Sequence, residues 1–147
     1  MRRLSSLVVL SLALWIAACA APSPRTDSEK PIELSGTYRG TYWITDHEGT
    51  SEQYRESGTC TMRFDDGHYE IEGDRIGLPP EGGGEYRVEG DQLQLTDTMQ
   101  HTADFDWSLI LSGRFQIDAG DDGYIRLEQH DLAHNRLHEL ELRKLDR

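Results

Sequence analysis

The chain is poor in cysteine, which limits how a domain of this size can be stabilised. Only Cys19 and Cys60 occur among its 147 residues, and modification of Cys19 would leave no internal disulfide possible. Stability must then come from packing. Cys60 lies in the segment 57–62, which has no basic residue, so we expect it to be a small buried hydrophobe and not a reactive thiol.

Positive charge is also scarce. The sequence has 15 Lys and Arg against 27 Asp and Glu, for a formal net charge of -12. Binding to nucleic acid phosphates needs clustered Lys and Arg, so we expect no nucleic acid partner. The excess of acid is typical of a surface that keeps a domain soluble, and attraction of a basic partner is the alternative.

Motifs for catalysis and for bound groups are incomplete or absent. No Gly-x-Ser-x-Gly and no nucleophile with its base can be found, so we predict no catalytic residue, no cofactor and no enzyme. The segment 138–142 begins like the zinc-protease pattern His-Glu-x-x-His, but it ends in leucine. The segment 118–129 lacks two oxygen ligands of a calcium loop, and Gly82–Gly84 lacks the Lys-Ser or Lys-Thr of a phosphate loop. We interpret the glycines as a flexible loop.

Three histidines, His130, His134 and His138, are spaced by four residues. On a helix they would share one face and could bind Zn, Cu or Ni, which makes them the alternative metal site. The alternation of apolar residues around them instead predicts two strands, with Leu127 and Leu140 facing inward. That parity places His138 inward and His130 outward, and only a bulge or a short helix would bring the three together. We therefore predict no metal site.

An export signal is present at the N-terminus. Residues 1–3 are basic at two positions, and residues 4–18 are apolar but too short to span a bilayer comfortably. Ile16-Ala17-Ala18-Cys19 resembles the lipobox of bacterial lipoproteins. This resemblance implies that Cys19 becomes the first residue of the mature protein and carries acyl chains such as palmitate, which anchor it in the membrane. The alternatives are an ordinary signal peptide with an incidental cysteine, or a retained membrane anchor.

The residues after Cys19 indicate location and domain limits. In Gram-negative lipoproteins an aspartate at the next position favours the inner membrane, and this chain has Ala20. The resemblance therefore implies the outer membrane, facing the periplasm, if the source is Gram-negative. We divide the chain into a signal peptide (1–18), the acylated cysteine with a flexible Pro-containing linker (19–31), and one domain (32–147).

The domain shows the period-two alternation of apolar residues that is typical of strands. Eight runs are expected, over residues 37–45, 53–64, 68–73, 86–88, 93–95 and 107–117, and around 125–127 and 140–142. Breaks between them carry Gly, Asp, Asn and Pro, and no long amphipathic helix intervenes. This pattern predicts an all-β, eight-stranded antiparallel up-and-down barrel, which either fills with its own side chains or holds one small ligand.

The strand pattern resembles the lipocalin-like (calycin) barrels of small bacterial lipoproteins. The opening Leu34-Ser35-Gly36-Thr37-Tyr38 is similar to the lipocalin start, in which an aromatic residue closes the barrel bottom, although lipocalins usually have Trp where Tyr38 stands. The resemblance implies a lipid-anchored periplasmic domain that binds a small apolar ligand or acts as an accessory protein of the cell envelope. The domain is short for a roomy cup, which favours a narrow barrel that contacts proteins through its loops.

A metal-binding or metal-sensing envelope lipoprotein is the alternative function, and it would use His130, His134 and His138. The Cys-x-x-Cys motif of the lipocalin-like copper-resistance lipoproteins is missing from this chain.

Overall fold

The computed structural model describes residues 31–46, 54–74, 78–103 and 106–145. The predicted signal peptide, Cys19 and nearly all of the linker lie outside the described residues. Eight strands and one short 3-10 helix are present: β1 (Gly36–Asp46), β2 (Tyr54–Asp65), β3 (His68–Gly73), β4 (Gly82–Glu89), β5 (Gln92–Asp97), η1 (Trp107–Leu109), β6 (Gly113–Ala119), β7 (Tyr124–Asp131) and β8 (Arg136–Lys144).

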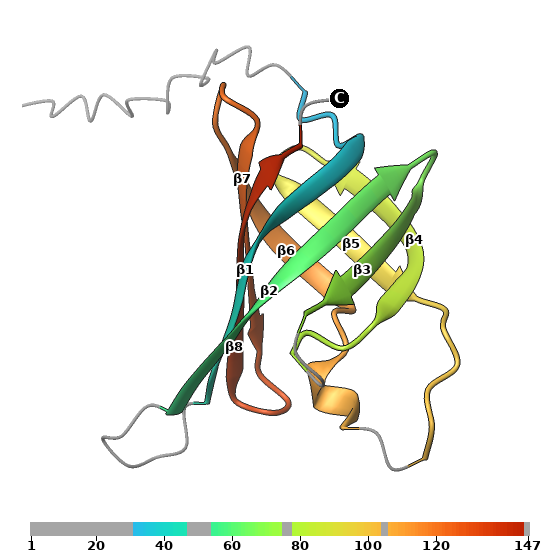
Figure 1. Ribbon diagram of the computed structural model, residues 1–147, viewed down its shortest axis with the longest axis vertical. Coiled ribbons are helices and arrows are strands. Elements are labelled where there is room, and N and C mark those ends of the chain that lie inside the picture. The colour runs from blue at the N-terminus through green and yellow to red at the C-terminus, as the bar shows by residue number, and fades with distance from the viewer. Residues whose placement is uncertain (1–30, 47–53, 75–77, 104–105, 146–147) are drawn as a thin grey trace, which may run out of the picture.

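The strands form a closed barrel (Figure 1). Each strand pairs antiparallel with the next one along the chain, and β8 returns to pair with β1 over nine residue pairs, from Tyr38 opposite Lys144 to Asp46 opposite Arg136. Closure leaves no free sheet edge. The all-β, eight-stranded up-and-down fold that the sequence predicted is therefore confirmed.

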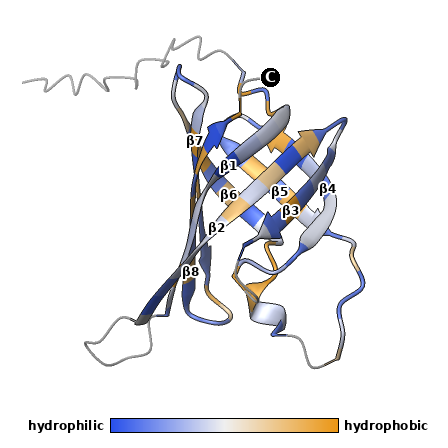
Figure 2. Ribbon diagram, viewed as in Figure 1, coloured by the Kyte–Doolittle hydropathy of each residue, from blue (hydrophilic) through white to orange (hydrophobic). Residues whose placement is uncertain are grey.

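The barrel interior is packed with side chains. Hydrophobic residues alternate with hydrophilic ones along the strands (Figure 2), and the large hydrophobic residues that face inward from β1, β2, β3, β5, β6, β7 and β8 are buried. The large side chains with under 2% exposure are Tyr42, Met62, Phe64, Tyr69, Ile71, Leu93, Leu95, Phe115, Leu127, His138, Leu140 and Leu142. The fourth strand contributes the half-buried Tyr86 and Val88. Of the two possibilities for a small barrel, the structure shows an interior occupied by its own side chains.

Gly82–Gly84 begins β4, so the prediction of a flexible loop there was wrong. A Cβ atom on Gly84 would lie 2.0 Å from the carbonyl oxygen of Thr96 on β5, and one on Gly82 would lie 3.0 Å from a carboxylate oxygen of Asp97. Glycine at these positions allows β4 and β5 to approach closely. The prediction failed because prolines followed by a run of glycines are a composition typical of loops.

The sixth predicted strand began too early. Residues Trp107–Leu109 form η1, and β6 starts only at Gly113. The cause is local, because the Asp106 carboxylate accepts a hydrogen bond from the Ser108 backbone N–H at 3.0 Å and caps a helical turn. The apolar spacing of residues 107–111 looks like a strand, but it belongs to a turn of helix that packs on the barrel.

The two ends of the barrel differ. We call the turn end the one with the β2–β3, β4–β5 and β6–β7 turns, and the loop end the one with the other four connections. The chain enters and leaves at the turn end (Figure 1): the Tyr86 hydroxyl donates to the carbonyl of Leu34 at 2.8 Å, and the backbone N–H of Leu145 donates to the carbonyl of Thr37 at 2.8 Å. Within the described ranges, no helix has the length and apolar character needed to cross a membrane.

Tyr38, the aromatic residue of the segment that resembles the lipocalin start, lies at the turn end. It is 3% exposed, meets Phe64 edge-to-face at 5.7 Å between ring centroids, and has the Lys144 ammonium 5.8 Å from its own ring centroid. An aromatic side chain therefore packs at this end of the barrel.

Candidate recognition site at the loop end

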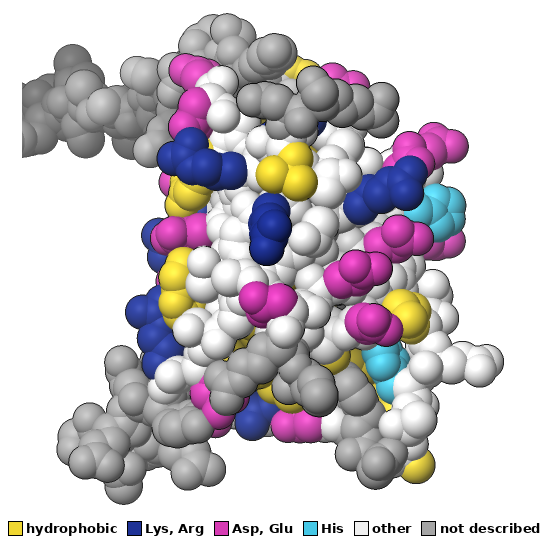
Figure 3. All heavy atoms as spheres, in the orientation of Figure 1, with side chains coloured by type: hydrophobic (Ala, Val, Ile, Leu, Met, Phe, Trp, Pro, Cys, Tyr) yellow, Lys and Arg dark blue, Asp and Glu magenta, His cyan; other side chains and the backbone are white. Residues whose placement is uncertain are grey.

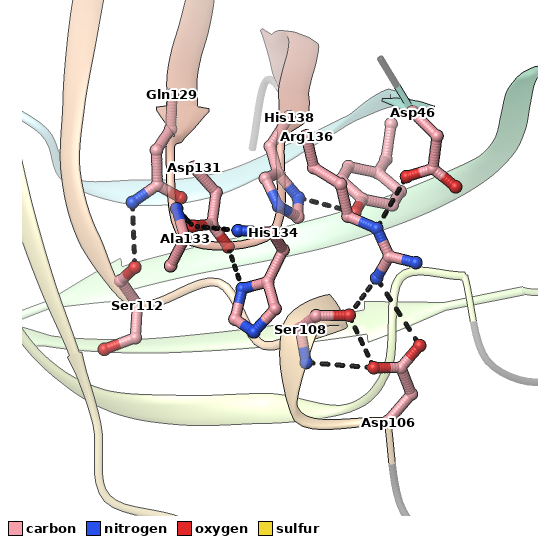
Figure 4. A network of polar contacts seen from close by, with 11 residues as sticks. Asp46, Asp106, Ser108, Ser112, Gln129, Asp131, Ala133, His134, Arg136 and His138 are labelled. Atoms are coloured by element: carbon pink, nitrogen blue, oxygen red, sulfur yellow. Dashed lines mark hydrogen bonds and ion pairs between the residues drawn. The ribbon is translucent and has the colours of Figure 1, made fainter. Parts of the chain in front are cut away.

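A pocket of about 420 Å³ lies at the loop end, between the β5–β6 connection and the β7–β8 turn. Its apolar lining comes from Met99, Trp107 and Ile110, and its polar lining includes Gln129 and His134. Figure 4 shows the polar side of this region, where η1 faces the β7–β8 turn. None of the lining residues belongs to the fully buried set that fills the barrel, so the pocket lies at the open loop end, beyond those side chains.

Exposed apolar side chains gather at this end. Trp107 is 59% exposed, Met99 46% and Leu132 89%. Among the described residues the other exposed large hydrophobic side chain is Leu145, which lies at the turn end. Large apolar groups cost free energy in water, and several of them at one end of a small domain make that end a candidate contact surface.

Trp107 is held on a rigid support. Its ring meets that of His101 edge-to-face, with centroids 5.8 Å apart and planes at 79°. His101 in turn pairs with Asp97 through Nε2 at 3.1 Å, and both of these side chains are only 7% exposed. The Asp97 carboxylate also accepts the backbone N–H of Met99 at 2.9 Å. The exposed indole therefore packs against an imidazole that is itself buried and ion-paired. A side chain that is already ordered in this way loses less conformational entropy when a partner binds.

The opposite wall of the pocket carries a fixed carboxylate. Asp131 accepts His134 Nδ1 at 2.6 Å and the backbone N–H of Ala133 at 2.9 Å. Burial acts to raise the pKa of Asp131, but the hydrogen bonds from His134 and from the turn backbone together outweigh it and hold the pKa below its usual range. Asp131 is therefore an anion at neutral pH. Beside it, the Gln129 amide donates to the carbonyl of Ser112 at 2.9 Å and ties β7 to the segment before β6.

Arg136 on β8 fastens η1 to the barrel (Figure 4). Its Nε donates to Asp46 on β1 at 2.6 Å, and its Nη1 reaches Asp106 at 3.4 Å and the hydroxyl of Ser108. The hydroxyl of Ser108 donates to Asp106, and this hydrogen bond lowers the pKa of that carboxyl. One guanidinium therefore connects β1, β8 and the turn that carries Trp107.

A buried polar pair lies inside the barrel. The hydroxyl of Tyr42 and Nδ1 of His138 are 2.8 Å apart, and the side chains are 0% and 1% exposed. Burial lowers the pKa of His138 to about 4 and raises the pKa of Tyr42 above its usual range. Both groups are therefore neutral at neutral pH and satisfy each other within the core.

The structure does not bring the three predicted histidines together. Register places Gln129 opposite His138 and His130 opposite Leu137, so His138 points into the barrel and His130 points outward, as the strand parity predicted. His130 contacts Glu128 at 3.2 Å, and His134 contacts Asp131. The described ranges contain no group of three or more His, Cys, Asp or Glu side chains placed to hold a metal ion.

Of the two cysteines, the structure describes only Cys60. Cys60 is 3% exposed on β2, and burial raises the pKa of its thiol to about 12, so it behaves as the small buried hydrophobe that the sequence predicted. Cys19, the predicted lipid attachment site, lies outside the described residues.

Comparison with protein-family models, with curated proteins and with solved structures gives no match for this chain. The functional argument therefore depends on the geometry of the loop end. That geometry offers a largely exposed aromatic side chain, an open pocket and ionised carboxylates, which together suit recognition of another molecule.

Proposed function

We propose that the protein is a lipid-anchored barrel of the cell envelope that recognises a partner protein through its loop end. The observation that supports this most is the exposed side chain of Trp107, which packs on His101 and lines an open pocket. The barrel interior, by contrast, is already occupied by buried side chains. A filled barrel is a scaffold that presents its loops. A small apolar ligand enclosed within the barrel is less favoured, because twelve large side chains take up that space.

The direction of the tether supports the same proposal. Since the chain enters at the turn end, a lipid on Cys19 and the linker of residues 19–31 would hold the turn end toward the membrane. The loop end would then face away from the lipid, toward the periplasm of a Gram-negative cell, where other envelope proteins are accessible. Fully extended, the linker reaches roughly 35–40 Å, which leaves the loop end free to reach its partner.

The alternative, a metal-binding lipoprotein, gains no support from the positions of the histidines. His138 is enclosed with Tyr42 in the core and His130 lies on the outer surface, so these two side chains cannot chelate one ion in this fold.

The proposed function can be tested with the mature lipidated protein as bait in pull-downs from detergent-solubilised envelope, analysed for both proteins and lipids. The matched pair of variants is Trp107→Ala at the loop end and Trp43→Ala on the outer face of β1, which remove the same side chain from two places. We expect a protein that is retained by the wild type and by Trp43→Ala and lost with Trp107→Ala. Recovery of the same proteins by all three baits would contradict the proposal.

The lipid anchor has a separate test. The intact mass of the purified mature chain should show an acylated Cys19 as the first residue. An unmodified N-terminus produced by cleavage elsewhere would refute the anchor.

A further inference from the structure

Carboxylates outnumber cations around the loop-end pocket. The ion pairs of the pocket residues and of η1 join His101 to Asp97, His134 to Asp131, and Arg136 to two further carboxylates, which are Asp46 and Asp106, while Arg55 on the outer face of this end is balanced by Glu139. Arg136 is the one Arg or Lys in the pairs around the pocket, so among the described residues, with histidine counted as neutral, the four carboxylates carry three negative charges that these pairs leave uncompensated. Figure 3 shows that carboxylates also gather over β3 and β4, and the whole chain has a formal net charge of -12. The field at the pocket therefore favours a cation.

The apolar side of the pocket suits the same kind of group. Trp107 is 59% exposed and Met99 is 46% exposed, and both line the pocket together with Asp131. The face of an indole attracts an ammonium or a guanidinium, and the methylenes of Lys or Arg pack against apolar side chains. A pocket of about 420 Å³ accommodates one such side chain with its neighbours.

We infer that the pocket between Trp107 and Asp131 receives a Lys or Arg side chain from a segment of the partner protein in which apolar residues flank the basic one. This inference rests on the proposed function and specifies the chemistry of its partner. Exposed Leu132, at the tip of the β7–β8 turn, extends the apolar contact beyond a single side chain, which favours a peptide segment over a free cation. The same charges disfavour phosphate-bearing ligands.

The test is calorimetric titration of the lipidated full chain in neutral detergent with three synthetic peptides, acetyl-Ala-Leu-X-Leu-Ala-amide, in which X is lysine, norleucine or glutamate. Norleucine keeps the methylenes and removes the charge. We expect the lysine peptide to bind about tenfold more tightly than the norleucine peptide, as a cation over an indole with a nearby carboxylate should, and the glutamate peptide not to bind.

Variants locate the site. Trp107→Ala should abolish binding of the lysine peptide while Trp43→Ala leaves it unchanged. Asp131→Asn should weaken binding about fivefold, whereas the charge-matched Asp118→Asn at the turn end should leave it within about twofold. If Asp131→Asn lowers the melting temperature of the barrel, Asp106→Asn is used in its place to remove one negative charge from the loop end.

The outcomes separate this inference from the proposed function. Equal affinity for the lysine and norleucine peptides, or equal loss with Asp118→Asn, would overturn the inference while leaving recognition through Trp107 intact. Absence of saturable binding of the lysine peptide up to about 10 mM would also overturn it. The proposed function fails only if the pull-down does not depend on Trp107.

Discussion

Acid should destabilise this barrel through His138 in a narrow range of pH. The pKa of His138 is lowered from 6.5 to about 4 in the folded protein, chiefly by burial. Between these two pH values His138 is protonated in the unfolded chain and neutral in the folded chain. The free energy of unfolding therefore falls as the pH drops from about 6.5 to 4, and this histidine does not affect it above that range. The loss at pH 4 amounts to about 3 kcal/mol, since each unit of pKa difference is worth about 1.4 kcal/mol.

The assay is urea unfolding of the full chain followed by circular dichroism at pH 7, 6, 5 and 4. His138→Leu should abolish this part of the pH dependence, although it should cost about 1–3 kcal/mol at pH 7 because the hydroxyl of Tyr42 is left unpaired in the core. The double variant Tyr42→Phe with His138→Leu should recover most of that cost, because both polar partners are then gone.

The control is His130→Gln, because His130 is an exposed histidine of the adjacent strand. It should keep the wild-type pH dependence. The lowered pKa values of Asp74, Asp106, Asp122 and Asp131 affect stability at lower pH and are common to all of these variants. The reasoning is refuted if His138→Leu loses stability between pH 6.5 and 4 as steeply as the wild type does.

Three further predictions concern single positions. In the mature chain with Cys19 acylated, Cys60 should resist a disulfide reagent such as Ellman's reagent at pH 8 while folded and react within seconds in urea; fast reaction of the folded chain would show that the Cys60 thiol is accessible. Gly84→Ala should cost about 2 kcal/mol or more in urea unfolding, because the new methyl group would meet the carbonyl of Thr96, and a neutral result would contradict the close approach of β4 and β5. Arg136→Gln should cost about 1 kcal/mol and speed hydrogen exchange in η1, whereas Arg143→Gln, which breaks an exposed ion pair with Asp122, should change neither by a measurable amount.

The fold was predictable because alternation along the strands is strong. A strand with large apolar residues at alternate positions, such as Met62 and Phe64 in β2, allows only one side to face the core. The turn at Asp66-Gly67 could be located from its residue types, because Asp-Gly is a strong hairpin signal. Both residues adopt positive φ there, as such a turn requires. The glycine start of β4 could not be predicted, because it depends on how close β5 comes.

The candidate site was only partly predictable. Strand parity placed His138 inside and His130 outside, since both lie within regular strands. The link from Arg136 to Asp46 spans 90 residues, and it exists only because closure of the barrel places β8 beside β1. Likewise, no local spacing relates Trp107 to the pocket that it lines, because the strand pattern concealed the helical turn that positions it.

The central claim is that recognition occurs at the loop end, through Trp107. Its most direct test is photo-crosslinking in intact cells, with a benzophenone amino acid in place of Trp107 in one variant and in place of Trp43 in another. The account predicts a discrete crosslinked protein band from position 107 that is absent at position 43. A band of equal strength from both positions, or one found only at position 43, would contradict it.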